Sequence, residues 1–388
     1  MANLVGARIE RKEDKKFLTG KGRYTADINL ANQTYAYFVR SPHARAKITK
    51  VDHSKAMKAP GVIDIFTGDC VVKDKIGGLI CGWKIVSQDG KDMKCPPHPV
   101  LAKDSVNFVG DHVAVVVAET LEQAKNAAEL VNVSYKIQKA VIKTEDATSF
   151  ENIHEGIDNN LSFDFLLGDK GKTNEAFSKA DKIVKLDIVN NRLIPNAMEP
   201  RAAIGDYNTS SDELTLYTAS QNPHLDRLIM SAFNAVHAEH KFRIVAPDVG
   251  GGFGSKINVY AEDVVVSYAS KKIGRPVKWV AERSESFMSD NHGRDHVTHA
   301  ELALNSDSKI IGIKVDTIAN LGAYSLVLAA VTPTYLYAPL LLGIYDIPTA
   351  CCTVKGVYTN TAPTDAYRGA GRPEATYVIE RIVTEAAK

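Results

Sequence analysis

The segment from Asp248 to Lys256 has the most unusual residue spacing in the chain: Gly250, Gly251, Gly252, Phe253 and Gly254 follow one another. Glycines at this density let the backbone approach a ligand closely and turn amide hydrogens towards an anion. The common nucleotide motifs do not fit, because Ser255 separates Gly254 from Lys256 and stands where a dinucleotide fingerprint needs its third glycine. The spacing favours cofactor binding, with a purely structural glycine turn as the alternative.

A second glycine-rich segment, Ala366 to Ala375, contains two arginines. Arginines beside small residues can present fixed donors to a carboxylate, a phosphate or an oxyanion. Pro373 and Glu374 are also typical of the first turn of a helix. We therefore take Arg368 as the functional candidate and Arg372 as a structural residue at the start of a helix.

Gln221 lies just after an expected strand at residues 214–218, where open α/β sheets usually bind ligands. An ordinary turn before a helix is the alternative, since Gln-Asn-Pro is also a good turn sequence. Glu199 is either a buried acid or the partner of Arg201, and we expect the pair. His292, His296 and His299 match no zinc-protease motif, and there is no Gly-x-Ser-x-Gly elbow.

The elements that must position these residues alternate between strands and helices. Residues 113–118, 121–131 and 131–137 predict a strand, a capped helix and a strand joined by a right-handed crossover. Further strands are expected at 35–40, 62–66, 183–189, 214–218, 242–246 and 277–281. A helix is expected after the glycine loop, and this helix ends at Gly274. The weak pattern between 138 and 181 places a domain boundary there.

The composition is that of an ordinary protein of two or three domains: 388 residues, 45% hydrophobic and 24% charged. A formal net charge of +1 argues against sequence-independent nucleic-acid binding. The five cysteines lack CxxC spacing and the start lacks a secretion signal, so we expect a reduced, cytoplasmic protein. Residues 317–345 carry no charge, but Pro333 and Pro339 favour protein interior over a membrane span.

Taken in order, several segments resemble the large, molybdenum-binding subunit of the xanthine dehydrogenase and aldehyde oxidase family of molybdenum hydroxylases. They are residues 17–27, 40–45, 109–114 and 196–201, the Gln221 turn, the glycine loop and residues 366–369. The resemblance implies an α+β fold with α/β elements: an a/b hammerhead-like domain at 1–145, then the first half of the molybdopterin-binding region at 146–388.

The family resemblance also implies roles for the site residues. The glutamine matching Gln221 approaches an oxo ligand of molybdenum, and the loop Gly251–Gly254 supplies backbone donors and, through Phe253, a wall. The arginine matching Arg368, followed by Gly369, faces the metal and the substrate. The metal is held through the pterin, in its cytosine dinucleotide form, without a direct protein ligand. Iron-sulfur clusters and FAD belong on a small and a medium partner subunit.

Differences between this sequence and the family's subgroups narrow the range of possible substrates. Carbon monoxide dehydrogenases are similar at residues 343–348 and 356–360, but their copper-binding cysteine corresponds to Gly369 here. Purine oxidisers carry a glutamate where Ile257 stands. The remaining candidate substrates are an aldehyde and an N-heteroaromatic compound, either of which would be hydroxylated with oxygen from water.

The family's second cofactor-binding half, with its catalytic base glutamate, is absent from these 388 residues, and neither Glu262 nor Glu374 lies in the right motif to replace it. We expect a separate second-half polypeptide or a truncated chain, and activity only with that half. The rival hypotheses are a non-catalytic scaffold of the same fold and, more distantly, a nicotinamide dehydrogenase.

Overall fold

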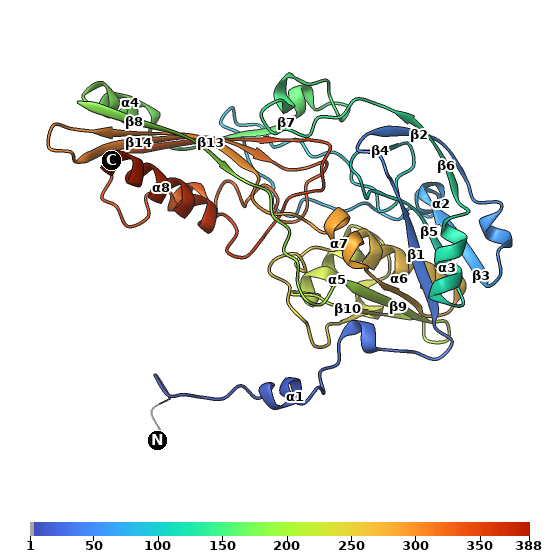
Figure 1. The fold of residues 1–388 in the computed structure, drawn as a ribbon. Helices are drawn as coiled ribbons and strands as arrows, with labels where there is room; N and C mark the ends of the chain where they lie inside the picture. The colour runs from blue at the N-terminus through green and yellow to red at the C-terminus, as the bar shows by residue number, and fades with distance from the viewer. Residues whose placement is uncertain (1–3) are drawn as a thin grey trace.

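The computed structural model describes residues 4–388, which form three β-sheets and the helices around them (Figure 1). The largest sheet has seven strands in the order β11-β10-β9-β12-β1-β5-β3. Their bounds are β1 Thr34–Arg40, β3 Val62–Thr67, β5 His112–Ala118, β9 Ala202–Asn208, β10 Glu213–Thr218, β11 Phe242–Val245 and β12 Val277–Val280. Thr34 of β1 pairs in parallel with Val277 of β12. The N-terminal and later parts of the chain therefore share one sheet.

The continuous apolar run in β5 is buried on both faces, as its sequence predicts. Val115 and Val117 pack in the core that contains helix α6 (Ala261–Ile273), whereas Val116 packs on the opposite face against Ala127 of helix α3 (Leu121–Ala128). Alternate residues of a strand point to opposite faces, so one strand contributes to both cores. The predicted capping box between Thr120 and Gln123 is present at the start of α3.

The crossover predicted between residues 113 and 137 is wrong, although its three elements form where expected. β6 (Asn132–Ile137) lies in a separate sheet of order β4-β2-β6, with β2 at Ala46–Asp52 and β4 at Ser105–Val106. Both edges of β5 are occupied, by β1 and β3, and both pairings are antiparallel. The strands that occupy these edges come from elsewhere in the chain, so local order could not reveal them.

The other lobe is built on a five-stranded sheet of order β7-β15-β14-β13-β8 (Figure 1). The strands are β7 Leu161–Gly168, β8 Lys182–Asn190, β13 His296–Leu304, β14 Ile310–Asn320 and β15 Ala350–Val357. The C-terminal helix α8 (Arg372–Ala387) packs against β8 and β13. The remaining helices are α1 Asp14–Leu18, α2 Gly68–Lys73, α4 Lys170–Ser178, α5 Pro223–Ala232 and α7 Arg283–Ser289.

A buried ion cluster ties the N-terminal strands to the later part of the chain. Glu262 of α6 is fully buried and accepts two hydrogen bonds from Arg201, at 2.9 and 3.0 Å. It also accepts one from Arg40 of β1 at 2.8 Å, and His112 of β5 lies 2.9 Å from it. Burial alone would raise the pKa of this carboxyl, but the surrounding cations hold its pKa well below the ordinary value.

The uncharged stretch at 317–345 lies largely in the protein interior up to Thr334, as predicted, whereas Tyr335, Leu340 and Ile344 farther along it are exposed. It begins at the end of β14 and continues through turns in which Ala323, Ala330 and Tyr337 are fully buried. Among residues 4–388, no helix is long and apolar enough to cross a membrane.

Candidate cofactor site

Gln221 is held against the glycine loop by two hydrogen bonds. Its backbone N–H donates to the carbonyl oxygen of Lys256 at 2.8 Å, and its side-chain Oε1 accepts from the N–H of Gly254 at 2.9 Å. A backbone N–H can only donate, so this contact fixes the orientation of the side-chain amide. Its NH₂ group has no hydrogen-bond partner within residues 4–388, and the residue is exposed. The structure thus leaves two donors available at this point.

Two glycines of the loop are required by close contacts. A Cβ atom at Gly252 would lie 2.2 Å from Oε1 of Gln221. At Gly254, where φ is +103°, it would lie 2.3 Å from the carbonyl oxygen of Ala366. Any side chain at these positions would push apart the segments that the loop joins.

Three successive backbone N–H groups of the loop are free to bind a ligand. Gly250 donates to Glu199 and Gly254 donates to Gln221, but the N–H groups of Gly251, Gly252 and Phe253 have no partner in the described part of the chain. Consecutive unpaired N–H groups of this kind form anion-binding concavities. Phe253 has a left-handed backbone, with φ of +52°, and the residue is 43% exposed.

Arg368 lies directly beside this loop. Its backbone N–H donates to the carbonyl oxygen of Phe253 at 2.9 Å, and its guanidinium carbon lies 5.8 Å from the centre of the Phe253 ring. Arg294 donates to the carbonyl oxygen of Arg368 at 2.9 Å and forms a buried ion pair with Glu374. The side chain of Arg368 remains exposed, and so does Gly369 next to it.

The structure therefore brings together every residue predicted for the site. Gln221, the Gly251–Gly254 loop and the Arg368–Gly369 turn come from three distant parts of the sequence and are joined by hydrogen bonds. Gln221, Phe253 and Arg368 are exposed there, whereas Gly254 is buried. The surface offers amide, backbone N–H and guanidinium donors. The roles that these residues play there remain predictions.

The interpretation of Glu199 as the partner of Arg201 is wrong. Glu199 accepts hydrogen bonds from Nζ of Lys256 at 2.8 Å and from the N–H of Gly250 at 2.7 Å, so it holds the glycine loop in place. Arg201 instead binds Glu262 and Asp290. The two residues are only two positions apart in sequence, but their side chains have different partners in the fold.

Lys256 and Asp226 are supporting residues that the sequence patterns did not reveal. The Lys256 side chain is 1% exposed, and burial lowers its pKa despite the Glu199 carboxylate. Asp226 accepts from the hydroxyl of Ser220, which in turn accepts from the N–H of Asn222 at 3.0 Å. This network fixes the turn on both sides of Gln221. Burial, together with the nearby Asp263 carboxylate, raises the pKa of Asp226 to about 8.

The residues present fit an anionic cofactor that brings its own metal ligands. No group of three or more His, Cys, Asp or Glu residues within residues 4–388 could hold a metal ion directly. The donor surface suits the phosphate of a molybdopterin and the oxo ligands of its molybdenum, because it combines unpaired N–H donors with a cation. Glu199, whose carboxylate contacts the loop, is already paired with Lys256 and Gly250.

Two domain families match the chain. The aldehyde oxidase and xanthine dehydrogenase a/b hammerhead domain matches residues 19–139, and the molybdopterin cofactor-binding domain matches residues 153–388. The fold and site thus define a molybdopterin-binding protein. The chain belongs to the xanthine dehydrogenase and aldehyde oxidase family of molybdenum-dependent oxidoreductases. The predicted fold class and family are confirmed, whereas the border between residues 145 and 146 remains a prediction.

Similar proteins include large subunits and a solved enzyme of this family. The carbon monoxide dehydrogenase large chain of Hydrogenophaga pseudoflava is 34% identical, over 96% of this chain and 47% of its own length. The crystal structure of quinoline 2-oxidoreductase from Pseudomonas putida 86 has a TM-score of 0.92 and 30% identity, covering 98% of this chain and 48% of that one. The nicotinate dehydrogenase large molybdopterin subunit of Eubacterium barkeri is 28% identical, over 99% of this chain and 86% of its length.

The share of each relative that is covered differs. The chain spans about half the length of most of these curated relatives but nearly all of the Eubacterium barkeri subunit. A chain with both domains at about this length therefore exists within the family.

Proposed function

We propose that this chain forms the molybdenum-cofactor side of the active site in a multi-subunit hydroxylase. The observation that carries the proposal is the Gln221–Gly254 hydrogen bond, which leaves the Gln221 NH₂ group beside three free loop N–H groups and Arg368. In this proposal electrons leave through iron-sulfur and FAD partner subunits, and the enzyme acts in the cytoplasm.

The bound molybdenum cofactor would supply the redox chemistry that inserts an oxygen atom from water into the substrate. The chain's own residues bind and orient that cofactor. The NH₂ group of Gln221 and the N–H groups of Gly251 and Gly252 donate to its oxygen atoms without having to rearrange, because the loop is already fixed. Arg368 supplies a positive charge at the open side, where it can orient an anionic or polar group.

We propose an N-heteroaromatic compound or an aldehyde as the substrate, with the N-heteroaromatic class favoured. Relatives named for quinoline and nicotinate support that class. Carbon monoxide is disfavoured, because Gly369 stands at the position of the copper-binding cysteine. Its φ of +93° would strain a cysteine there, and a Cβ would lie 2.9 Å from the Pro373 ring. Ile257 likewise disfavours purines.

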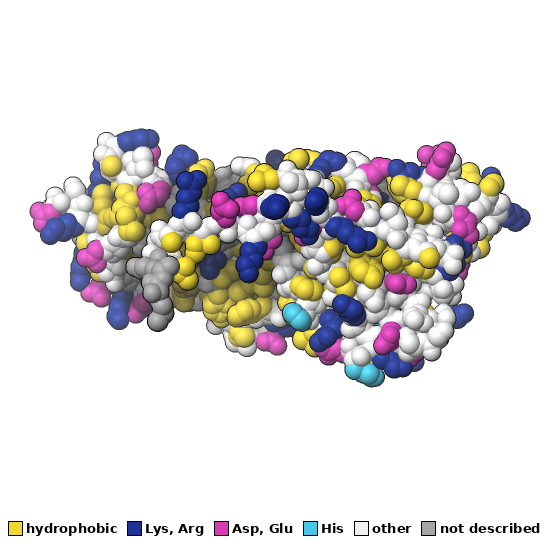
Figure 2. All heavy atoms as spheres, turned by 90° about the horizontal axis from the view of Figure 1, so that it is seen from below, with side chains coloured by type: hydrophobic (Ala, Val, Ile, Leu, Met, Phe, Trp, Pro, Cys, Tyr) yellow, Lys and Arg dark blue, Asp and Glu magenta, His cyan; other side chains and the backbone are white. Residues whose placement is uncertain are grey.

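The catalytic base glutamate is proposed to come from a second cofactor-binding half, supplied by further sequence or by a separate polypeptide. The subunit of Eubacterium barkeri, which is comparable in length, supports a separate chain. Hydrophobic side chains gather near the middle of the face seen in Figure 2. Apolar surface of this kind is typical of faces that contact another domain or chain. The alternative is a scaffold chain of the same fold. Such a chain either needs the second-half polypeptide for activity or binds no metal.

Cofactor extraction and activity measurements test the proposal. The chain is purified with and without a candidate second-half polypeptide and its iron-sulfur and FAD partners. We expect molybdenum, a pterin with a cytosine nucleotide, and dye-linked hydroxylation of quinoline or nicotinate in the complete complex only. Metal-free protein from cells that assemble the cofactor would favour the scaffold, extraction of NAD would favour a dehydrogenase, and full activity of the lone chain would contradict the second-half proposal.

A further inference from the structure

Residues 79–98 form an irregular antiparallel hairpin that carries two of the five cysteines. The N–H of Leu79 donates to the carbonyl oxygen of His98, and the N–H of Met93 donates to that of Ile85, both at 2.8 Å. Cys81 lies on the first arm and Cys95 on the second, between these two paired points. The hairpin's pairing therefore brings the two cysteines towards each other.

The rest of the protein holds both arms in place. The N–H of Gly82, next to Cys81, donates to the carbonyl oxygen of Val327 at 3.1 Å. The N–H of Lys94, next to Cys95, donates to that of Ser162 at 2.8 Å, and the buried Tyr358 hydroxyl donates to the Lys94 carbonyl oxygen at 2.9 Å. These contacts fix the backbone next to both cysteines.

The two thiols influence each other's ionisation and are chemically unequal, and the Cys81 thiol also contacts the carbonyl oxygen of Trp83 at 3.6 Å. The neighbouring Cys81 thiol and the positive charge of Lys84 lower the pKa of Cys95, and the pKa of Cys81 is raised by the Cys95 thiol and by burial. Both residues are partly exposed. A thiolate is the nucleophile in disulfide exchange, so Cys95 is the thiol that reacts first.

We propose that Cys81 and Cys95 form a reversible disulfide with a low-molecular-weight disulfide, RSSR, as oxidant. The Cys95 thiolate attacks one sulfur of RSSR, so that an S–S bond forms to Cys95 and RS⁻ leaves. The Cys81 sulfur, having lost its proton, then attacks Cys95 and releases the second RS⁻. In total, two thiols lose two electrons and two protons, and RSSR becomes two RSH.

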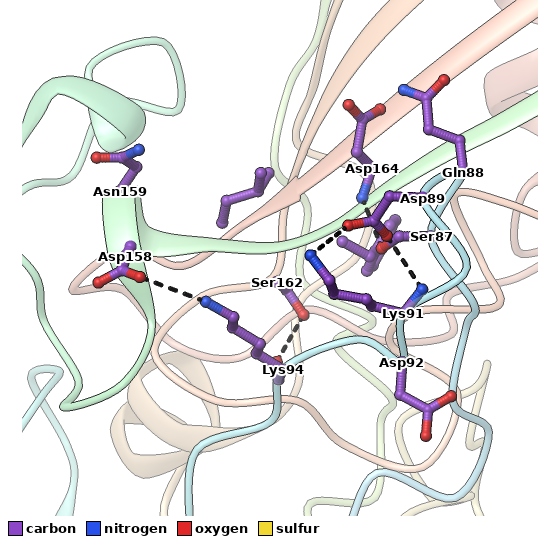
Figure 3. Close-up of a pocket in the computed structure, with 12 residues that line it drawn as sticks. Ser87, Gln88, Asp89, Lys91, Asp92, Lys94, Asp158, Asn159, Ser162 and Asp164 are labelled. Atoms are coloured by element: carbon purple, nitrogen blue, oxygen red, sulfur yellow. Dashed lines mark hydrogen bonds and ion pairs between the residues drawn. The ribbon is translucent and has the colours of Figure 1, made fainter.

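The disulfide would restrain the groove at the tip of the hairpin. Figure 3 shows this groove, of about 450 Å³, in which Ser87–Lys94 of the hairpin face Asp158–Asp164. The N–H of Gln88 donates to the carbonyl oxygen of Asp164 at 2.8 Å, so the tip is attached to β7. A bond between the arms would limit how far this tip can open. None of the predicted cofactor-site residues lines this groove.

Cys70 provides a matched control. It is also partly exposed, but its sulfur contacts the Thr67 hydroxyl at 3.7 Å rather than another thiol. Cys351 and Cys352 are buried neighbours in β15. A general tendency of this protein to oxidise would therefore show at Cys70, whereas a built pair shows at Cys81 and Cys95 alone.

Peptide mapping of the full chain tests the proposal. The protein is equilibrated in oxidised glutathione, free thiols are alkylated, and trypsin then cuts after Lys84 and Lys94. We expect one disulfide-linked pair, of peptides 76–84 and 95–103, which disappears after reduction, together with slower hydrogen exchange at the amides of Ser87 and Met93. In Cys81→Ser, glutathione should stay attached to Cys95, and Cys95→Ser should react more slowly at Cys81.

The pattern in Cys70→Ser should equal that of the wild type. Full alkylation of Cys81 and Cys95 after equilibration in oxidised glutathione would overturn the proposal, as would linkage of either one to Cys70 or to a second chain. Because the wild-type protein alone gives this readout, the conclusion does not depend on whether the variants fold. Unchanged hydrogen exchange on oxidation would overturn the restraint of the groove.

Discussion

The side-chain oxygen of Gln221 accepts a hydrogen bond from the backbone N–H of Gly254 at 2.9 Å, across 33 positions of sequence. This bond joins the turn after β10 to the glycine loop before α6. It also leaves the Gln221 NH₂ group without a partner within residues 4–388, so one residue both fixes the site and offers donors to a ligand.

Replacing Gln221 separates these two tasks. Gln221→Glu keeps an acceptor for Gly254 but removes the NH₂ donors, and Gln221→Ala removes both. We predict that kcat of the assembled enzyme falls by roughly 10²–10³-fold in either variant, the usual effect of losing one preorganised donor. Steady-state kinetics at matched molybdenum content checks this. Gln88→Ala, at an exposed position outside the cofactor site, is the control, and equal activity of Gln221→Ala and this control would contradict the assigned role.

Gly252→Ala should disrupt the same contact from the other side. The new methyl group would lie 2.2 Å from Oε1 of Gln221, so that side chain or the loop must move. We predict loss of bound cofactor, measured as molybdenum per chain, and a destabilisation of about 1–3 kcal/mol. Gly171→Ala in helix α4 adds the same methyl group without such a contact and should retain the metal. Normal molybdenum content in Gly252→Ala would refute the prediction.

Arg368 and Arg372 should behave differently although both are exposed. Arg368→Ala should leave the free energy of unfolding within about 0.5 kcal/mol of wild type and reduce kcat/KM by at least 10-fold, because its side chain has no structural hydrogen bond within residues 4–388. Arg372 donates to the carbonyl oxygens of Gly369 and Ala370. Arg372→Ala should therefore lower stability slightly and leave kcat/KM nearly unchanged. The reverse pattern would exchange the two roles.

Asp226 should give the protein a pH-dependent stability. Its pKa is raised from 3.8 to about 8 in the folded protein, so between these values the folded state binds more protons than the unfolded state. The free energy of unfolding then falls as pH rises, by up to about 1.4 kcal/mol per pH unit from this residue. Urea titrations at several pH values should show a flatter dependence in Asp226→Asn. An unchanged slope would mean that Asp226 is ionised in the folded state.

Removing the charge of Glu262 should weaken the junction between the N-terminal strands and α6. Glu262→Gln leaves Arg201, Arg40 and His112 around a neutral group in a fully buried position. We predict a loss of about 3–5 kcal/mol in the free energy of unfolding, as expected when a buried ion pair loses one partner. Glu122→Gln, on the exposed side of α3, should cost less than about 0.5 kcal/mol. Similar values for the two variants would show that the cluster contributes little.

Local patterns predicted the elements well because their signals are themselves local. The apolar run in β5, the capping box of α3 and the glycine at the end of α6 each depend on neighbouring residues, and each element formed at its predicted place. The prediction of the crossover was wrong because strand pairing joins residues that are distant in sequence. The predicted pairing of Glu199 with Arg201 was wrong for the same reason. The actual partner, Lys256, is 57 positions away in sequence, whereas Arg201 is two positions away.

The sequence by itself determined the family, through several motifs in a fixed order, and the residue types that a cofactor site needs. Only the tertiary structure decided which of their groups are free to act. Side-chain oxygens of Glu199 and Gln221 accept from the N–H groups of Gly250 and Gly254, whereas the N–H groups of Gly251–Phe253 and the Gln221 NH₂ group have no partner within residues 4–388. Hydrogen-bond partners depend on distance in space, and contacts between remote segments are set by the packing of the whole chain.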